Sequence, residues 1–180
     1  MSSFDTNERA NVIFPWYESR INKGNGHYMV ASDADLDIAV PLILAFKTPA
    51  TASTYLRDFK VTAECTEPAT IEILEGSTIT VDTATADVDP LNQNRNSAVT
   101  SGIWSIKTVP VVNEAAQGST ITVDGTSLRS IPFGLTSVNN QIELEIPVLK
   151  ADTIYAIRLT TTADNAIGKI QAEWLEYVWG

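Results

Sequence analysis

The sequence predicts an all-β protein, folded as an antiparallel β-sandwich that is jelly-roll-like. Apolar and polar residues alternate along several segments, most clearly along residues 141–149, where Ile142, Leu144 and Ile146 share one strand face. Thr, Ile and Val favour strands and are abundant, and Gly, Asn, Asp and Pro separate the runs. A sustained helical period of 3.6 residues is absent from the sequence.

The same alternation places the individual strands. Strands are expected at residues 28–32, 38–47, 58–65, 69–75, 77–82, 101–109, 119–124, 126–132, 141–149, 153–160 and 167–174. Residues 51–59 are predicted to form a helical turn. Two connections predict hairpins: residues 150–152 join two strands, and Asp124 with Gly125 supplies the residues of a type I′ turn.

Residues 1–25 differ in composition from the rest of the chain. They mix aromatic residues with Pro15 and a Gly- and Asn-rich exit. We expect either an edge strand of the sandwich or an arm that packs on a neighbour. Residues 26–180 are expected to form a single β-sandwich domain.

One heptapeptide, GSTITVD, occurs twice, at residues 76–82 and 118–124. Two copies are too few for a solenoid or a propeller. They indicate a repeated strand-and-turn unit, which arose either by duplication or by convergence of two strands with similar neighbours.

The alternation changes phase at Trp174. Even positions are apolar up to Trp174, whereas Leu175, Tyr177 and Trp179 are the apolar positions afterwards. Because a regular strand cannot bury both sets on one face, we expect a bulge or a tail that leaves the sheet. Such an aromatic tail needs cover, either from its own domain or from a neighbour.

Composition excludes several classes of partner. The net charge is −10, with −1 in residues 1–60 and −9 in residues 61–180, so we expect no nucleic acid and no anionic membrane as partner. The first third of the chain is the better candidate to meet a negative surface. Cys65 is the only cysteine and is expected in the core or at an edge. Residues 1–9 are polar where a signal peptide would be apolar, and we expect synthesis in a reducing cytoplasm.

The sequence offers little for catalysis, and no enzyme, cofactor or metal is expected. His27 is the sole histidine, and it indicates an ordinary surface or strand-start residue. Glu143 and Glu145 have the roughly 7 Å spacing of an inverting glycosidase pair, but the alternation makes them the solvent face of a strand. Residues 33–38 begin like a calcium loop that then fails at its sixth and twelfth positions, which favours a solvated turn.

Several segments in order resemble a family of virion structural proteins of tailed bacteriophages, which includes capsid decoration and head-fibre proteins. The resemblance covers residues 68–177 and rests on ILEGSTIT, NQNRNS, GSTITVDGTSL, LKADTIYAIRLT and EWLEY. The chain departs from the family at Leu175, where an aromatic residue is usual, and in its longer connection after Asp82.

This resemblance implies a non-enzymatic protein that decorates and stabilises a phage capsid by binding its outer surface. The implied partners are the major capsid protein and further copies of the chain, with a trimer favoured, and the implied location is the virion after synthesis in the bacterial host cytoplasm. The interface candidates are Trp16, Tyr17, Arg95, Leu175, Tyr177 and Trp179. Arg95 is expected to clamp its loop or, alternatively, to contact a partner.

A second hypothesis is a carbohydrate- or receptor-binding module of a tail fibre. It rests on the β-sandwich together with four tryptophans, Trp16, Trp104, Trp174 and Trp179. In this hypothesis they stack on sugars, although tryptophans of a β-sandwich more commonly pack in the core.

Overall fold

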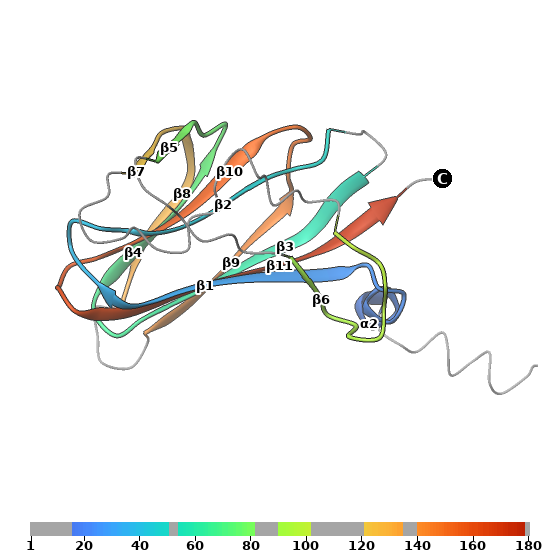
Figure 1. Cartoon of the computed structure of the whole chain (residues 1–180), viewed down its shortest axis with the longest axis horizontal. Coiled ribbons are helices and arrows are strands. Elements are labelled where there is room, and N and C mark those ends of the chain that lie inside the picture. The colour runs from blue at the N-terminus through green and yellow to red at the C-terminus, as the bar shows by residue number, and fades with distance from the viewer. Residues whose placement is uncertain (1–15, 51–53, 82–89, 102–120, 135–139, 179–180) are drawn as a thin grey trace, which may run out of the picture.

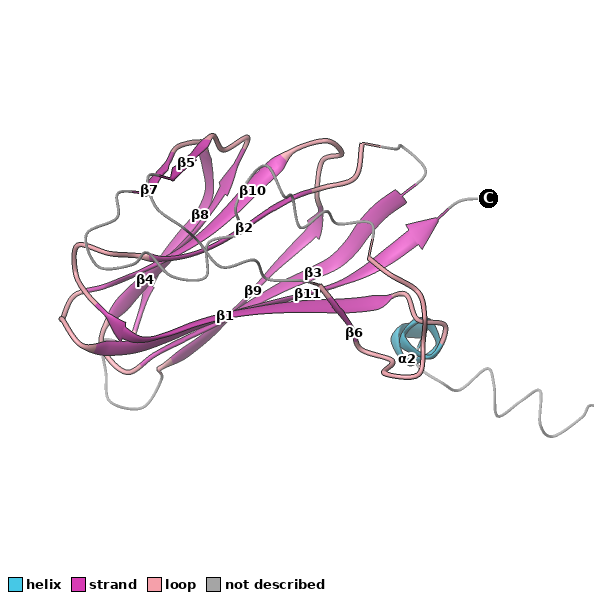
Figure 2. Cartoon of the chain, in the orientation of Figure 1, coloured by secondary structure: helices cyan, strands magenta, loops and turns pink. Residues whose placement is uncertain are grey.

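The computed structural model describes residues 16–50, 54–81, 90–101, 121–134 and 140–178. Two antiparallel sheets pack face to face, which confirms the predicted all-β sandwich (Figures 1 and 2). The elements are α2 (Trp16–Asn22), β1 (Gly26–Leu36), β2 (Leu42–Lys47), β3 (Thr54–Cys65), β4 (Ala69–Glu75), β5 (Ile79–Val81), β6 (Leu91–Asn92), β7 (Ile121–Val123), β8 (Thr126–Phe133), β9 (Gln141–Val148), β10 (Ile154–Thr161) and β11 (Ala166–Val178).

The strand pairing is nested from the ends of the chain inward. β1 pairs with β11, β2 with β10, β3 with β9, β4 with β8, and β5 with β7. The larger sheet has the order β6-β1-β11-β3-β9, the second has β2-β10-β4-β8, and β5-β7 form a third, short sheet. From β1 to β4, and again from β8 to β11, successive strands alternate between the two larger sheets.

Four aromatic side chains join the two sheets through the core. Phe46 of β2 lies with its ring centroid 5.2 Å from that of Phe59 in β3, on the opposite sheet. Tyr155 stacks on Phe46 at 5.7 Å, and Trp174 stacks on Phe59 at 6.1 Å. All four are buried, and such offset or tilted ring pairs add to the stabilisation that comes from burial alone.

Most predicted strands are confirmed, with shifted bounds. Residues 69–75 match β4, whereas the expected strand at 28–32 extends over Gly26–Leu36. The helical turn predicted within residues 51–59 is wrong from Thr54 on, because this segment is the start of β3. β3 pairs with both β11 and β9, and hydrogen bonding on both sides overrides local preference. The strand expected at 101–109 lies outside the described residues except for Ser101, which is not in a strand.

The N-terminal segment contains a short helix where the sequence suggested an edge strand or an arm. α2 ends at Asn22, and Gly24, two residues later, has a φ of +79°, the left-handed conformation that commonly terminates helices. The amides of Gly24 and Asn25 donate to the carbonyls of Ile21 and Arg20, which closes the last turn. The edge-strand alternative is therefore wrong for the part of this segment that the structure describes.

The two GSTITVD copies pair with each other. β5 and β7 are the Ile-Thr-Val segments of the two copies, and they run antiparallel with Thr80 opposite Thr122. They continue the β4–β8 ladder beyond a break, where the backbone amide of Thr78 donates to the Asp124 carboxylate at 2.7 Å. The predicted hairpin between β7 and β8 is wrong: these strands follow one another along the same ladder and do not pair. Gly125 has a positive φ, but Asp124 does not, so the type I′ turn is absent.

The predicted hairpin at residues 150–152 is also wrong, because β9 and β10 belong to different sheets. The connection is held by Thr48, whose hydroxyl donates to the Lys150 carbonyl at 2.6 Å and accepts from the Thr153 amide at 2.9 Å. The Tyr155 hydroxyl accepts from the Lys150 amide and donates to the Glu75 carboxylate at 2.7 Å. The short loop thus carries the chain from one sheet to the other.

We expect Ile157→Ala to lower the free energy of unfolding by about 2–5 kcal/mol, because Ile157 is fully buried between the sheets. Ile167→Ala is the matched control, since the Ile167 side chain is 56% exposed, and it should change stability by less than about 0.5 kcal/mol. Urea unfolding followed by tryptophan fluorescence measures both. Equal losses of stability in the two variants would contradict the placement of Ile157 in the core and of Ile167 at the surface.

We expect the contribution of Glu75 to stability to depend on pH. Lys150 and then Tyr155 donate to the Glu75 carboxylate and lower its pKa below the ordinary 4.5. A pKa lowered by folding stabilises the protein above pH 4.5, and this stabilisation is lost as the pH falls through the lowered value. Glu75→Gln should therefore be less stable than the wild type at pH 7, and the difference should shrink in acid. The exposed control Glu67→Gln should track the wild type in chemical unfolding at both pH values.

Candidate functional site

The predicted interface residues that the structure describes lie on segments that meet at one end of the sandwich. We call this the α2 end and define it by residues 16–26, 90–101 and 174–178, which lie together in Figure 1. Gly26 lies opposite Leu175, and the Glu176 amide donates to the Asn25 carbonyl at 2.9 Å. The Gln93 amide donates to the Gly26 carbonyl at 2.9 Å, which fixes the middle segment to the first.

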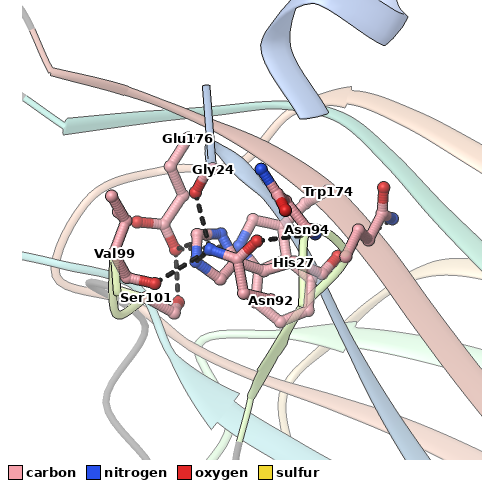
Figure 3. A network of polar contacts seen from close by, with 9 residues as sticks. Gly24, His27, Asn92, Asn94, Val99, Ser101, Trp174 and Glu176 are labelled. Carbon is pink, nitrogen blue, oxygen red and sulfur yellow. Dashed lines mark hydrogen bonds and ion pairs between the residues drawn. The ribbon is translucent and has the colours of Figure 1, made fainter. Parts of the chain in front are cut away.

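Asparagine side chains fix residues 92–99 to the turn after α2. The Asn92 amide nitrogen donates to the carbonyls of Gly24 and Val99, both at 2.8 Å, while its Oδ1 accepts from the Asn94 backbone amide (Figure 3). Asn94 in turn donates from Nδ2 to the Asn22 carbonyl at 2.9 Å. Both polar atoms of the Asn92 side chain thus have partners, and these bonds hold the loop against the turn after α2.

We call these hydrogen bonds of Asn92 and Asn94 the asparagine clamp. A buried carboxylate lies beneath this clamp. Glu176 is only 7% exposed, and its Oε1 accepts from the Trp174 indole at 2.9 Å and from the Ser101 hydroxyl (Figure 3). The Nδ1 of His27 lies 3.8 Å from the same oxygen, and the imidazole stacks on the Trp174 ring. Burying a carboxylate is costly unless donors bond to it, and the two donors come from β11 and from the segment that ends at Ser101.

This arrangement supports a structural role. His27 is 1% exposed at the start of β1, so the strand-start alternative is confirmed and the surface alternative is wrong. The indole, hydroxyl and imidazole all face one carboxylate oxygen, whereas a nucleophilic serine would be aligned on an imidazole base. The group anchors Ser101 and β11 to β1.

The six interface candidates differ in whether the structure describes their side chains and in whether those side chains are exposed. Trp16 and Tyr17 lie in α2 and Tyr177 in β11, but their side chains, like all of Trp179, are outside what the structure describes. Leu175 is fully buried within the chain, so its side chain is closed to a partner.

The burial of Leu175 follows from the predicted phase change, which is confirmed. The register of β11 against β3 shifts between Glu173 and Leu175, and as a result both Trp174 and Leu175 are buried.

Arg95 is exposed, and the hydrogen bonds that hold its loop among the described residues come from asparagines, so its role as a loop clamp stays a prediction. Lys23 is also exposed. Lys23 and Arg95 directly follow the two residues joined by the hydrogen bond between Asn22 and Asn94, so they lie on neighbouring backbone segments. Leu91 and Val99, 46% and 47% exposed, lie on the same clamped segment. The α2 end therefore presents a patch of two cations and two apolar side chains, Lys23, Arg95, Leu91 and Val99.

The other candidates for chemistry have structural partners. Lys60 lies between Glu143 and Glu145, with its Nζ at 3.4 and 3.2 Å, and hydrogen bonds to Glu145 and then Glu143 raise the lysine pKa. Both glutamates are exposed, as expected of a solvent-facing strand. Cys65 is buried in the core, which confirms its predicted place.

The acidic run at residues 33–38 also serves the backbone. The Asp33 carboxylate accepts from the Asp35 amide at 2.9 Å, and that of Asp37 accepts from the Asn165 amide at 3.2 Å. Within the described ranges, no group of three His, Cys, Asp or Glu side chains is placed to hold a metal ion.

Sequence reasoning missed the asparagine clamp and the buried Glu176. The run NQNRNS did contain a signal, because asparagines favour turns in which their side chains bond to nearby backbone. Glu176 carried no such signal, since its burial depends on the bulge in β11 and on segments distant in the sequence.

Comparison of the chain with protein-family models, with curated proteins and with solved structures finds no match. Over the residues described, no helix has the length and apolar character needed to cross a membrane.

We expect Asn92→Ala to release residues 93–101 from the turn after α2, because the substitution removes three hydrogen bonds. The free energy of unfolding should fall by about 1–3 kcal/mol, since the carbonyl of the buried Gly24 and that of Val99 lose their donor. Hydrogen exchange of the backbone amides in this segment should accelerate. Asn96→Ala is the control, because Asn96 is exposed and donates through its backbone alone. Equal exchange in both variants would show that the clamp has no effect.

Proposed function

We propose that this protein is a non-enzymatic structural protein of a tailed-phage virion, which decorates and stabilises the capsid by binding its outer surface. The observation that carries the proposal is the nested pairing of β1 with β11, β2 with β10, β3 with β9, and β4 with β8. We take this order, with successive strands alternating between the two larger sheets, as a jelly roll. Jelly rolls are common in viral capsid proteins and in lectins.

The ordered resemblance of residues 68–177 to virion proteins supports the same setting. It includes the NQNRNS segment, which is the clamped loop of the α2 end. It also includes residues 173–177, which contain the buried Trp174 and Glu176. The segments that carry the resemblance therefore include those that build the α2 end.

In this proposal the α2 end contacts the capsid. The protein carries a net charge of −10, so most of its surface repels an acidic partner, whereas Lys23 and Arg95 offer two cations beside Leu91 and Val99. The clamp holds the loop backbone before binding, which lowers the entropy that binding would cost. The major capsid protein is the partner, and the chain binds as a homo-oligomer, with a trimer favoured.

The alternative remains a carbohydrate- or receptor-binding module of a tail fibre. Its original basis was a stacking surface of tryptophans, and Trp174 does not contribute to one because it is fully buried beside Phe59.

The capsid proposal is tested with phage heads that lack this protein and with purified protein added back. We expect the double variant Lys23→Glu/Arg95→Glu to bind heads about tenfold more weakly in co-sedimentation, since two cations at the interface become anions. Arg129→Glu is the control, because Arg129 is exposed on β8 and the substitution replaces a cation by an anion once, half of the charge change of the double variant.

Two results would refute the proposal. One is mass spectrometry of purified virions that detects no copies of the chain. The other is wild-type protein that stays in the supernatant when the heads are sedimented.

A further inference from the structure

A cavity of about 600 Å³ opens on the larger sheet, away from the α2 end. Its lining includes Ser32, Lys169, Glu64 and Gln141, which are directly paired neighbours across β1, β11, β3 and β9. These residues therefore form one row on one face of the sheet. Because Cys65, which follows Glu64, points into the core, the row lies on the outer face.

The lining of this cavity is polar with balanced charge. The Lys169 ammonium lies 3.9 Å from the Glu64 carboxylate, so the two formal charges of the row offset each other. Asn140 and Gln141 add two exposed side-chain amides, and each amide offers both donors and acceptors of hydrogen bonds. In a protein of net charge −10, a cavity with balanced charge attracts neither a cation nor an anion strongly.

An apolar surface borders these polar groups. Ile167 lines the cavity, and its side chain is 56% exposed. Its backbone is held in place, because the Ile167 amide donates to the Thr66 hydroxyl at 2.9 Å and its carbonyl accepts from the Thr66 amide at 3.0 Å. The cavity thus combines a fixed apolar side chain with several hydrogen-bonding groups.

We propose that this cavity binds an uncharged sugar residue of a glycan. A pyranose ring presents many hydroxyl groups and an apolar face of C–H bonds, and it carries no charge. The amides of Asn140 and Gln141, with Glu64 and Lys169, match the hydroxyl groups, and Ile167 matches the apolar face. The volume lies within the range of small-molecule sites in proteins.

This site goes beyond the proposed capsid role and does not depend on it. Along β1, Ser32 lies six residues from Gly26, about 20 Å at the rise of an extended strand. A molecule docked through its α2 end would leave the cavity open to solvent, and a virion carrying many copies would bind glycans with increased avidity.

The test uses purified full-length protein and an array of immobilised neutral oligosaccharides, followed by calorimetric titration of the best-bound one. We expect Asn140→Ala/Gln141→Ala to lower the affinity about tenfold, because the sugar loses hydrogen bonds to both amides. The control is Glu143→Ala/Glu145→Ala, on the same strand and face but outside the cavity lining, and it should keep wild-type affinity. In NMR spectra, the backbone amides of residues 140, 141 and 169 should shift as sugar is added.

Three results would overturn the proposal: no neutral oligosaccharide binds at millimolar concentration, only acidic sugars bind, or the two double variants bind equally well. None of these results bears on the co-sedimentation with phage heads, so failure here is distinguishable from failure of the capsid role. Substitutions at Lys23 and Arg95 should in turn leave sugar binding unchanged.

Discussion

Phe46 packs against Phe59 across the sandwich, and this aromatic contact, extended by Tyr155 and Trp174, is the interaction on which the other features depend. It joins the two sheets at the level where β2, β3, β10 and β11 overlap. Because Trp174 enters the core here, its indole N–H is directed to Glu176, and a carboxylate can be buried at the α2 end. On the other sheet, the Tyr155 ring lies in the core and its hydroxyl donates to the Glu75 carboxylate. The same hydroxyl accepts from the Lys150 amide and so links Glu75 to the loop at Lys150. Each aromatic residue thus contributes packing with its ring and also orders a polar network with its donor.

Nested pairing of the strands determines which segments become neighbours. Pairing β1 with β11 brings residues near both ends of the chain to the α2 end, and β6 adds to the free edge of β1. A clamp made from Asn22, Asn92 and Asn94 therefore joins segments about seventy residues apart in sequence. Contacts of this kind close long loops, which costs more chain entropy than contacts between residues close in sequence.

The fold also separates two surfaces of different chemistry. The α2 end has exposed cations beside apolar side chains, whereas the cavity near Ser32 is lined by amides and a balanced pair of charges. Both surfaces are formed partly by connections between strands, which the sandwich core holds but does not cover. The two proposed binding roles therefore do not compete for the same residues.

The sequence by itself determined the secondary structure of most segments, because alternation with a period of two residues is a local property. It also predicted an irregularity after Trp174, either a bulge or a departing tail, since a phase change is visible in one segment, and the structure has a bulge there. The asparagine run carried a signal for a turn, but the prediction assigned the loop to Arg95 instead. The sequence did not determine which strands pair. The two hairpins predicted from short turns at Asp124 and at Lys150 are absent, and the GSTITVD copies pair across a long connection instead. Only the tertiary structure decided this, and with it the burial of His27, Glu176 and Leu175, because pairing depends on how apolar faces distant in sequence meet in one core.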